Sequence, residues 1–546
     1  MSQQLLMHVK VEYMIDLISI YDEVKQRLNG EERPLIRDVL KSIEQVDKPF
    51  LYIVKAPTGY GKTAISISCA VYSIFNSSLF TKVVHILPMR SIVEDVYFRA
   101  SRIMGKEAVK EKMMDVEEEK LEVFHLFPLN VTTVDTFTWD VMKLNTKKIG
   151  LIREEKAFGY DYLTQGSLMD SLLFFDEAHY ILEDEHMKIV FAVILELLLR
   201  YKTSLIISTA TLSKGYEEYF LSLAEGYGYD FKIFAPEDPD PFIKREEEKD
   251  FNIHLVDNDV ELVDNIARLI DLDKVNLVVV NSPYTAVSVY DRLSSSYEVD
   301  LFLLHGNMKK KHRENVLEKI RMYSRAKTPS IIITTQVIEA GVDISSDVLI
   351  TELSVAQSLI QRMGRVARYN EKFADIYILK SPGEPYPADK IEKTWRQLKE
   401  DAKLIHPRIP STYYNLLNQI HGRIQQEVDI RLSPNYTKAM KQLLIKLLDI
   451  RVRAPEILGQ VESIIRQQAF LREFTIPVKV EDEYILFSPR EVEKMFRKNL
   501  IEVRAGHGPV DPSRDFYKLA EEFALGKKSA EVVYIGEYDW VRGILP

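Results

Sequence analysis

The 546-residue sequence predicts an α/β fold: two tandem doubly wound parallel-sheet domains followed by a mainly helical C-terminal accessory domain. Short apolar runs alternate with helical stretches in two separate series. Between them lies the segment "PEDPDPFIKREEEKD" (236–250), which has three prolines and dense charge. Buried parallel strands read as continuous apolar runs, and their alternation with helices is typical of a doubly wound sheet.

Each series contains five strand-like runs. Those of the first series are at 50–56, 82–88, 130–135, 171–177 and 203–210. Those of the second are at 276–282, 299–306, 330–335, 347–353 and 374–380. Beyond "KSPGEPYPADK" the chain is mainly helical to about residue 470 and then mixed, without a catalytic pattern. We therefore expect domains over 1–236, with a helical lead-in, 251–385 and 386–546, with a linker over 237–250.

Composition limits the class of protein. The chain has 46% hydrophobic and 28% charged residues, which are ordinary globular values. Its single cysteine, Cys69, excludes an internal disulfide framework and fits a cytoplasmic location. The N-terminus lacks the pattern of a signal peptide, and no apolar run suggests a membrane span. A net charge of -10 argues against nonspecific coating of nucleic acid but permits a local basic track, such as residues 300–330.

A phosphate-binding loop follows the first strand, in "FLYIVKAPTGYGKTAISIS". Two glycines let backbone N–H groups approach phosphates, the lysine can reach the β- and γ-phosphates, and the threonine hydroxyl can join Mg²⁺ coordination. Ala56 stands where the general pattern has its first glycine. The candidate ATP-binding residues are Pro57, Thr58, Gly59, Tyr60, Gly61, Lys62 and Thr63.

An acid pair ends the fourth apolar run, in "SLLFFDEAHY". Ligands of such sheets bind at the carboxyl ends of the strands. Asp176 is expected to hold Mg²⁺, and Glu177 to orient and deprotonate the water that attacks the γ-phosphate. His179 alone would be an ordinary structural histidine, but beside this pair we interpret it as a residue that couples the nucleotide to the other domain.

Three arginines follow at a three-residue spacing in "QSLIQRMGRVAR" (357–368). At 100° per residue the segment is predicted to be an amphipathic helix, with Arg362, Arg365 and Arg368 opposite an apolar face. No acidic residue lies among them. A solvated surface is the simpler alternative, and the phosphate-binding loop and acid pair favour instead arginines that reach ATP.

The motifs "APTGYGKT", "DEAH", "STATL", "TTQVIEAGVDIS" and "QRMGRVAR", in this order, resemble superfamily 2 helicases of the DEAH/DExH type. The last two look most like the CRISPR-associated helicase of type I interference systems. This resemblance implies two RecA-like domains with ATP between them and single-stranded DNA across them, moved with 3′ to 5′ polarity. It also implies recruitment by an effector complex of the Cascade type.

The resemblance assigns further roles. Arg365 and Arg368 match the arginine fingers, while Gln361 and Arg362 would organise the interface. The nucleotide would also meet Gly341 and Asp343. The hydroxyls expected to link the acid pair to domain closure are those of Ser208, Thr209 and Thr211.

Candidate DNA contacts stand at strand ends. Thr335 and Gln336 at the tip of one strand are placed to contact a backbone phosphate. Four more match the DNA-track motifs of the family: Arg90, Thr133, Asn281 and His305. Such contacts bind without reading sequence. Ordinary loop ends are the alternative for these four.

Two departures from the family matter. Arg37 stands where many of these helicases have a glutamine that reads adenine, so adenine selectivity is open. None of the eleven histidines is followed by aspartate, whereas the nuclease domain often fused to these helicases requires a His-Asp dipeptide. We therefore expect a stand-alone helicase subunit that works with a separate nuclease chain and docks its effector through the region after 385.

Two alternatives stay open. A DNA-repair or RNA helicase of the same superfamily would lack neighbouring genes for effector subunits and a His-Asp nuclease. A nucleotide-dependent binding switch that never translocates would show no stimulation of ATP hydrolysis by single-stranded DNA.

Overall fold

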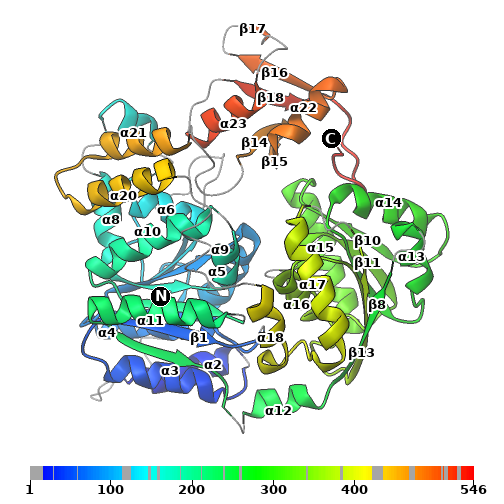
Figure 1. Cartoon of the computed structure of the whole chain (residues 1–546), viewed down its shortest axis with the longest axis horizontal. Coiled ribbons are helices and arrows are strands. Elements are labelled where there is room, and N and C mark those ends of the chain that lie inside the picture. Colours follow the sequence, from blue (N-terminus) through cyan, green and yellow to red (C-terminus); the bar gives the residue numbers. More distant parts are fainter. Residues whose placement is uncertain are drawn as a thin grey trace. The chain divides into compact units, whose positions relative to one another are not determined.

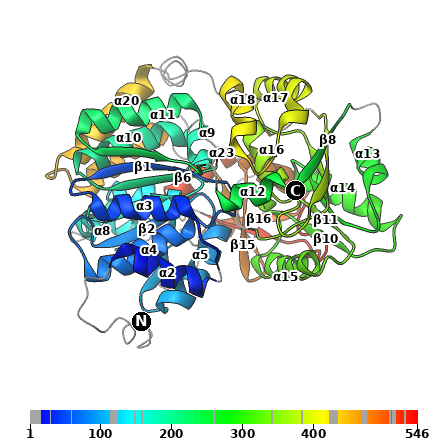
Figure 2. The ribbon, with the colours of Figure 1, turned by 90° about the horizontal axis from the view of Figure 1, so that it is seen from below.

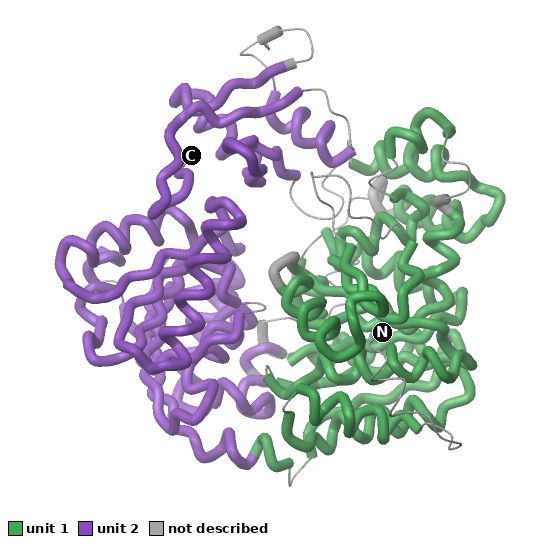
Figure 3. Tube along the Cα trace, turned by 180° about the vertical axis from the view of Figure 1, so that it is seen from behind, with its two compact units in different colours: residues 1–243, 422–473 green, residues 244–421, 474–546 purple. Residues whose placement is uncertain are grey.

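The structure, a computed structural model, forms two compact units. It describes residues 16–28, 30–57, 59–112, 124–145, 149–156, 160–184, 186–210, 212–237, 240–257, 261–339, 342–381, 385–420, 434–465, 474–505, 508–509, 515–525 and 530–545. Unit 1 comprises residues 1–243 and 422–473, and unit 2 comprises residues 244–421 and 474–546 (Figure 3).

Unit 1 is built on a seven-stranded, fully parallel sheet of order β3-β4-β2-β5-β6-β1-β7 (Figure 1). The strands are β1 (Phe50–Lys55), β2 (Lys82–Leu87), β3 (Val109–Lys112), β4 (Leu129–Thr133), β5 (Ser171–Phe175), β6 (Leu205–Thr209) and β7 (Asp230–Phe234). The helices are α2 (Leu17–Arg27), α3 (Pro34–Gln45), α4 (Thr63–Phe75), α5 (Arg90–Met104), α6 (Val134–Val141), α7 (Ile149–Arg153), α8 (Tyr160–Met169), α9 (His179–Glu183), α10 (Met187–Arg200) and α11 (Lys214–Tyr227). In Figure 2, α10 and α11 cover one face of β1 and β6, and α3 and α4 cover the other.

The predicted strands of the first series are confirmed as β1, β2, β4, β5 and β6. Their side chains are almost all buried, because helices cover both faces of the sheet. The edge strands β3 ("VKEK") and β7 ("DFKIF") escaped prediction, since neither has an uninterrupted apolar run.

Unit 2 has a six-stranded parallel sheet of order β10-β11-β9-β12-β13-β8. Its strands are β8 (Asp250–Val256), β9 (Val275–Val279), β10 (Leu301–Leu304), β11 (Ser330–Thr334), β12 (Val348–Glu352) and β13 (Phe373–Leu379). Its helices include α13 (Leu262–Leu269), α14 (Pro283–Ser294), α15 (Lys310–Ala326), the short η2 (Gln336–Ile338) and α16 (Ala356–Met363). The five predicted strands of the second series are confirmed. The segment expected as a linker contains helix α12 (Pro241–Glu247) and leads directly into β8.

The expected accessory region, 386–546, is divided between the two units. Helices α17 (Ala388–Asp401) and α18 (Pro410–Ile420), with η3 (Ala402–Leu404) between them, belong to unit 2. Helices α20 (Pro434–Leu448) and α21 (Ala454–Ile465) pack on α10 and α7 of unit 1. There Lys143 Nζ donates to the carbonyl of Val452 at 3.2 Å.

The last part of the chain forms a small mixed sheet in unit 2, of order β15-β14-β18-β16-β17. Its elements are β14 (Ile476–Val480), β15 (Glu483–Phe487), α22 (Pro489–Arg497), β16 (Ile501–Ala505), β17 (Gly508–Pro509), α23 (Phe516–Ala524) and β18 (Glu531–Tyr534). Within the described ranges, no helix is both long enough and apolar enough to cross a membrane.

The prediction of one helix over 357–368 is wrong in its second half. Helix α16 ends at Met363, and Gly364 is its C-cap. Val366 then pairs with Ser346 in an isolated β-bridge, and Ala367 has a positive φ of 44°. Helical periodicity therefore does not assign Arg365 and Arg368 to a common face with Arg362.

Candidate active site

The phosphate-binding loop joins β1 to α4. Gly59 and Gly61 have φ values of 87° and 97°, which a side chain would strain. Lys62 is buried, and its Nζ donates to the Ala56 carbonyl at 3.2 Å and lies 3.4 Å from Glu177 Oε1. The loop thus has the backbone freedom, the ammonium and the helix N-terminus that suit a polyphosphate. Pro57 is buried beside them, and Thr58 lies outside the described residues.

Tyr60, between the two glycines, is fully buried and anchors the phosphate-binding loop to the rest of unit 1. Its hydroxyl donates to Asp240 Oδ2 at 2.5 Å, just before α12. Arg33 Nε donates to the Tyr60 carbonyl at 3.1 Å, and its guanidinium also lies over the ring of Phe242, 4.8 Å from the centroid. Asp240, Arg33 and Phe242 were missed from the sequence, because nothing in their local pattern connects them to the loop.

Asp176 follows β5 as a buried carboxylate. Ser208 Oγ donates to its Oδ1 at 2.8 Å, and His85 Nε2 lies 3.5 Å from its Oδ2. Burial alone would raise the pKa of Asp176, but His85, Lys62 and Ser208 together lower it to about 2. The group is therefore ionised throughout the physiological range.

These side chains fit a Mg²⁺ ion bound together with ATP. Such ions take one or two carboxylates plus phosphate oxygens and keep several waters. Asp176 offers the ionised carboxylate, and Thr63 offers a partly exposed hydroxyl at the start of α4. No cluster of three or more carboxylate, His or Cys ligands occurs in the described part of the chain.

Glu177 is held in a strained backbone conformation, with φ of 49°. Such outliers in non-glycine residues concentrate at functional sites. Its N–H donates to Asp176 Oδ1 at 3.0 Å, and its side chain is 16% exposed. The turn therefore places the Glu177 carboxylate next to Lys62, while the Glu177 N–H binds the neighbouring Asp176 carboxylate.

His179 and the hydroxyls of β6 lie beneath this pair. His179 Nδ1 lies 3.2 Å from Thr209 Oγ1, and burial next to Lys62 lowers the pKa of His179 to about 3. The imidazole is thus neutral and hydrogen-bonds to the same strand as Ser208. Thr211 lies outside the described residues.

His85 is a further buried residue of the site, in the middle of β2. Its Nδ1 is 2.8 Å from Ser66 Oγ, which itself donates to the Thr63 carbonyl at 2.9 Å. His85 therefore links the start of α4 to Asp176. The signal was visible in the sequence: "KVVHILP" is an otherwise apolar buried strand.

Arg362 of unit 2 is completely buried and has an acidic partner. The expectation of a cationic side chain without an acid nearby in the sequence is wrong for Arg362. Glu339 lies 23 residues earlier in the chain, and Arg362 Nε donates to Glu339 Oε1 at 2.7 Å. The remaining donors of Arg362 are satisfied by Thr351 Oγ1, the Glu352 carbonyl, Asn281 Oδ1 and Tyr386 OH. Burial opposes the charge, but Glu339 outweighs it and raises the pKa of Arg362.

Arg365 and Arg368 differ in how far they are available to a ligand. Arg365 is buried, and its guanidinium donates to the carbonyls of Glu339 and Val342. The Arg368 side chain is 15% exposed, with Nε 3.5 Å from Asp343 Oδ1. Arg368 is therefore the better candidate for a finger, while Arg365 holds the preceding loop. Gly341 lies outside the described residues, and Gln361 is buried in α16.

The candidate DNA-contact side chains are mostly engaged within the protein. Thr133 caps α6, and Asn281 Nδ2 donates to the Leu353 carbonyl at 2.9 Å. Gln336 Nε2 donates to the Asn281 carbonyl at 3.0 Å, and Thr335 is buried. These residues shape the strand ends, so a phosphate would meet chiefly their backbone. Arg90 begins α5, and its side chain lies outside the described set.

His305 is covered by the C-terminal segment of its own unit. Its Nδ1 accepts from the N–H of Asn307 at 3.2 Å, so its Nε2 carries the proton and donates to the Arg542 carbonyl at 2.9 Å. Burial lowers the pKa of His305 to about 4. A direct phosphate contact by this imidazole is therefore not available in this structure, contrary to expectation.

Arg37 is occupied by two acids. Its Nε donates to Glu32 Oε1 at 2.8 Å, and its Nη2 donates to Asp22 Oδ1 at 2.7 Å. Arg37 lowers the pKa of Glu32 to about 2. The Arg37 guanidinium is therefore already paired with carboxylates of its own unit.

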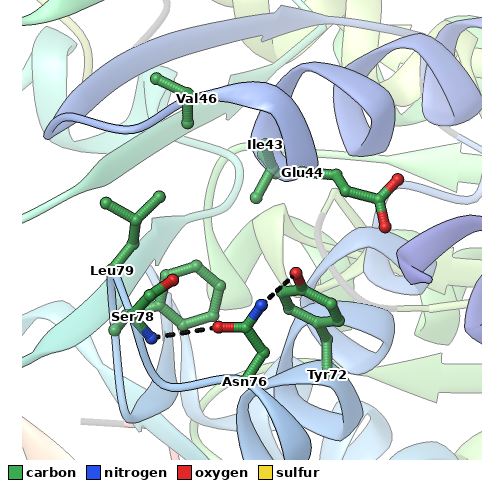
Figure 4. A pocket seen from close by; sticks show the side chains of 8 residues that line it. Ile43, Glu44, Val46, Tyr72, Asn76, Ser78 and Leu79 are labelled. Carbon is green, nitrogen blue, oxygen red and sulfur yellow. Dashed lines mark hydrogen bonds between the residues drawn. The ribbon is translucent and has the colours of Figure 1, made fainter. Parts of the chain in front are cut away.

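A small cavity of about 50 Å³ lies between α3 and α4. It is lined by Ile43, Glu44 and Tyr72 among others, and no residue of the phosphate-binding loop is among them (Figure 4).

Comparisons with known proteins agree with this arrangement. Residues 36–219 match the DEAD/DEAH box helicase family, and residues 273–371 match the family described as CRISPR-associated nuclease/helicase Cas3, C-terminal. The chain is 23% identical over 397 residues to the CRISPR-associated helicase Cas3 of Thermoproteus tenax, covering 69% of this chain and 65% of that protein.

Two solved structures show the same fold. The T. fusca Cas3-AMPPNP crystal structure has a TM-score of 0.59 and 15% identity, covering 95% of this chain and 65% of that one. A chain of a "CRISPR RNA-guided surveillance complex, pre-nicking" has a TM-score of 0.55 and 16% identity, covering 92% and 63%. The chain spans between 40% and 65% of the length of the first curated relatives it matches.

Proposed function

We propose that this chain, which carries a DEAD/DEAH box helicase domain and a Cas3-like C-terminal helicase domain, is an ATP-dependent helicase of type I CRISPR interference. It would move along single-stranded DNA from 3′ to 5′ and unwind target DNA. The observation that carries the proposal is the approach of Lys62 Nζ to within 3.4 Å of Glu177, which lies on a strained turn beside the ionised Asp176.

The chemistry follows from these positions. Lys62 would bind the β- and γ-phosphates of ATP, and Thr63 and Asp176 would hold Mg²⁺, whose positive charge would offset the negative charge of the phosphates. Glu177 orients the attacking water and accepts its proton. Arg368 would supply the positive charge that stabilises the transition state, and Arg365 would hold the preceding loop through the carbonyls of Glu339 and Val342.

The partners are inferred from the likeness to Cas3 helicases. We propose that single-stranded DNA follows the strand ends that carry Thr133, Asn281 and Gln336, bound mainly through backbone amides. A Cascade-type effector complex would deliver the chain to its target. A separate HD-nuclease subunit would cut the strand.

The test compares ATP hydrolysis and strand displacement in the wild type, Lys62→Ala, Glu177→Gln and a control, Glu196→Gln. Glu196 is a glutamate of the same unit, on α10, that pairs with Arg200. The two site variants should lose at least about 100-fold in DNA-stimulated kcat, as expected for a phosphate ligand and a general base. Glu177→Gln should still bind ATP. ATP hydrolysis at the wild-type rate by Glu177→Gln would contradict the assignment of Glu177 as the general base.

The choice of nucleic acid needs its own arm. Hydrolysis and unwinding are measured with single-stranded DNA, duplex DNA and RNA, with and without a candidate effector complex. Stimulation by RNA alone would favour an RNA helicase of the same superfamily. Hydrolysis that no nucleic acid stimulates would favour a binding switch.

A further inference from the structure

The loop after α16 places Arg368 directly after an unusual backbone position. Ala367 has φ of 44°, in the left-handed region that a residue with a Cβ rarely adopts. Its N–H donates to the Ser346 carbonyl at 3.0 Å, and the N–H of Arg368 donates to Ser345 Oγ at 2.7 Å. The turn directs the carbonyls of Ala367 and Tyr369 inward, and carbonyls so placed need a hydrogen-bond donor.

A single buried ammonium does so. Lys249, the last residue before β8, has a side chain that is 4% exposed. Its Nζ donates to the carbonyl of Ala367 at 2.8 Å and to that of Tyr369 at 3.0 Å. These are the residues immediately before and after Arg368. The Lys249 ammonium therefore binds the backbone on both sides of Arg368, the candidate arginine finger.

Lys249 is itself held in place. Glu246 Oε2 lies 3.0 Å from its Nζ, so the buried ammonium has a carboxylate as well as two carbonyls. Arg408 Nε lies 3.6 Å from the same Glu246 oxygen, and His406 Nε2 lies 3.2 Å from the Lys249 carbonyl. All of these side chains belong to unit 2. The Lys249 ammonium therefore has a defined position, because it is paired with the Glu246 carboxylate and donates to the carbonyls of Ala367 and Tyr369.

We propose that Lys249 is a positioning residue for ATP hydrolysis: by binding the carbonyls of Ala367 and Tyr369 it sets the direction in which Arg368 points. The proposal rests on the proposed function, in which Arg368 is the arginine finger. Lys249 acts through the backbone of the loop, to which its Nζ donates. Its side chain also explains how a non-glycine residue is kept in a left-handed conformation next to the finger.

The experiment measures kcat and KM for ATP, with saturating single-stranded DNA, in full-length Lys249→Met. Methionine keeps the length of the side chain and removes its donors. Because misplacement of a catalytic group by about 1 Å costs on the order of 100-fold, we expect kcat to fall by about 10- to 100-fold with KM for ATP nearly unchanged. The control is Lys143→Met, a buried lysine of unit 1 that likewise donates to a backbone carbonyl. It should lower thermal stability but leave kcat as it is.

A double-mutant cycle separates positioning from general damage. Arg368→Ala alone should lower kcat, and adding Lys249→Met should then lower it no further, because the group being positioned is gone. Equal losses from Lys249→Met with and without Arg368 would overturn the role of Lys249. An unchanged kcat in Arg368→Ala would instead overturn the finger assignment, and with it the proposed function of that residue. An unchanged kcat in Lys249→Met alone would overturn the proposal directly.

Discussion

Arg362 should stabilise unit 2 far more than a surface arginine would. Its substitution Arg362→Met keeps an unbranched side chain of similar length but removes every donor. Glu339, which is 2% exposed, then keeps its charge without its partner. Breaking a buried pair in this way typically costs about 3–5 kcal/mol. The loss of hydrogen bonds to Thr351 and Asn281 acts in the same direction.

Amide hydrogen exchange resolved by peptide provides the assay, since a chain with two units need not unfold in one step. A cost of 3–5 kcal/mol lowers protection of β9 and β12 by about 150- to 5,000-fold, at 1.36 kcal/mol per tenfold. Protection of unit 1 should stay unchanged. The double variant Arg362→Met/Glu339→Met should recover much of the loss, because an apolar pair of similar volume replaces the ions. Protection of unit 2 that stays at the wild-type level in Arg362→Met would refute the reasoning.

Two further predictions concern the phosphate loop and pH. Tyr60→Phe removes the hydrogen bond to Asp240, which as a bond to a charged group is worth about 1.5–3 kcal/mol, so KM for ATP should rise about tenfold or more in steady-state kinetics. Tyr52→Phe, which removes a similar bond to Asp230 outside the loop, should leave KM unchanged, and equal effects of both would contradict the prediction. The pKa of His305 is about 4 in the folded chain, against about 6.5 for an unperturbed histidine, so the unfolded chain binds the extra proton first as the pH falls. Stability should therefore be full above pH 6.5 and fall towards pH 4 by up to about 1.4 kcal/mol per pH unit, and His305→Gln should have a shallower profile of melting temperature between pH 7.5 and 5.5.

The fold was readable from the sequence because burial on both faces leaves a continuous apolar run. Every residue of β5, "SLLFF", and of β9, "VNLVV", is buried. Such short, mainly apolar runs are typical of parallel strands that are covered on both faces. Within each sheet the motif loops follow the carboxyl ends of parallel strands, so the loops of one sheet can be placed at a common edge without knowledge of any side-chain contact. Edge strands such as β8 alternate exposed and half-buried residues and carry no such signal.

The side-chain partners could not be read in the same way. Arg362 and Glu339 lie 23 residues apart, and His305 meets a carbonyl 237 residues away. An absence of acids within one segment says nothing of acids that the fold brings to it. The helix over 357–368 also ended early, because a β-bridge at Val366 competes with one more helical turn, and propensity does not report such tertiary contacts.

Each unit has a strained backbone position next to a candidate catalytic side chain, and a buried lysine lies beside each of them. Glu177 in unit 1 and Ala367 in unit 2, beside Arg368, both have positive φ values without being glycine. Each is stabilised by a buried cation within its own unit: Lys62 near the Glu177 carboxylate, and Lys249 on the Ala367 carbonyl. A relaxed backbone at either position would turn the reactive side chain away from its present direction. The lysines thus offset a local cost of order 1–3 kcal/mol at each turn, and removing either should relax the turn before it unfolds the unit.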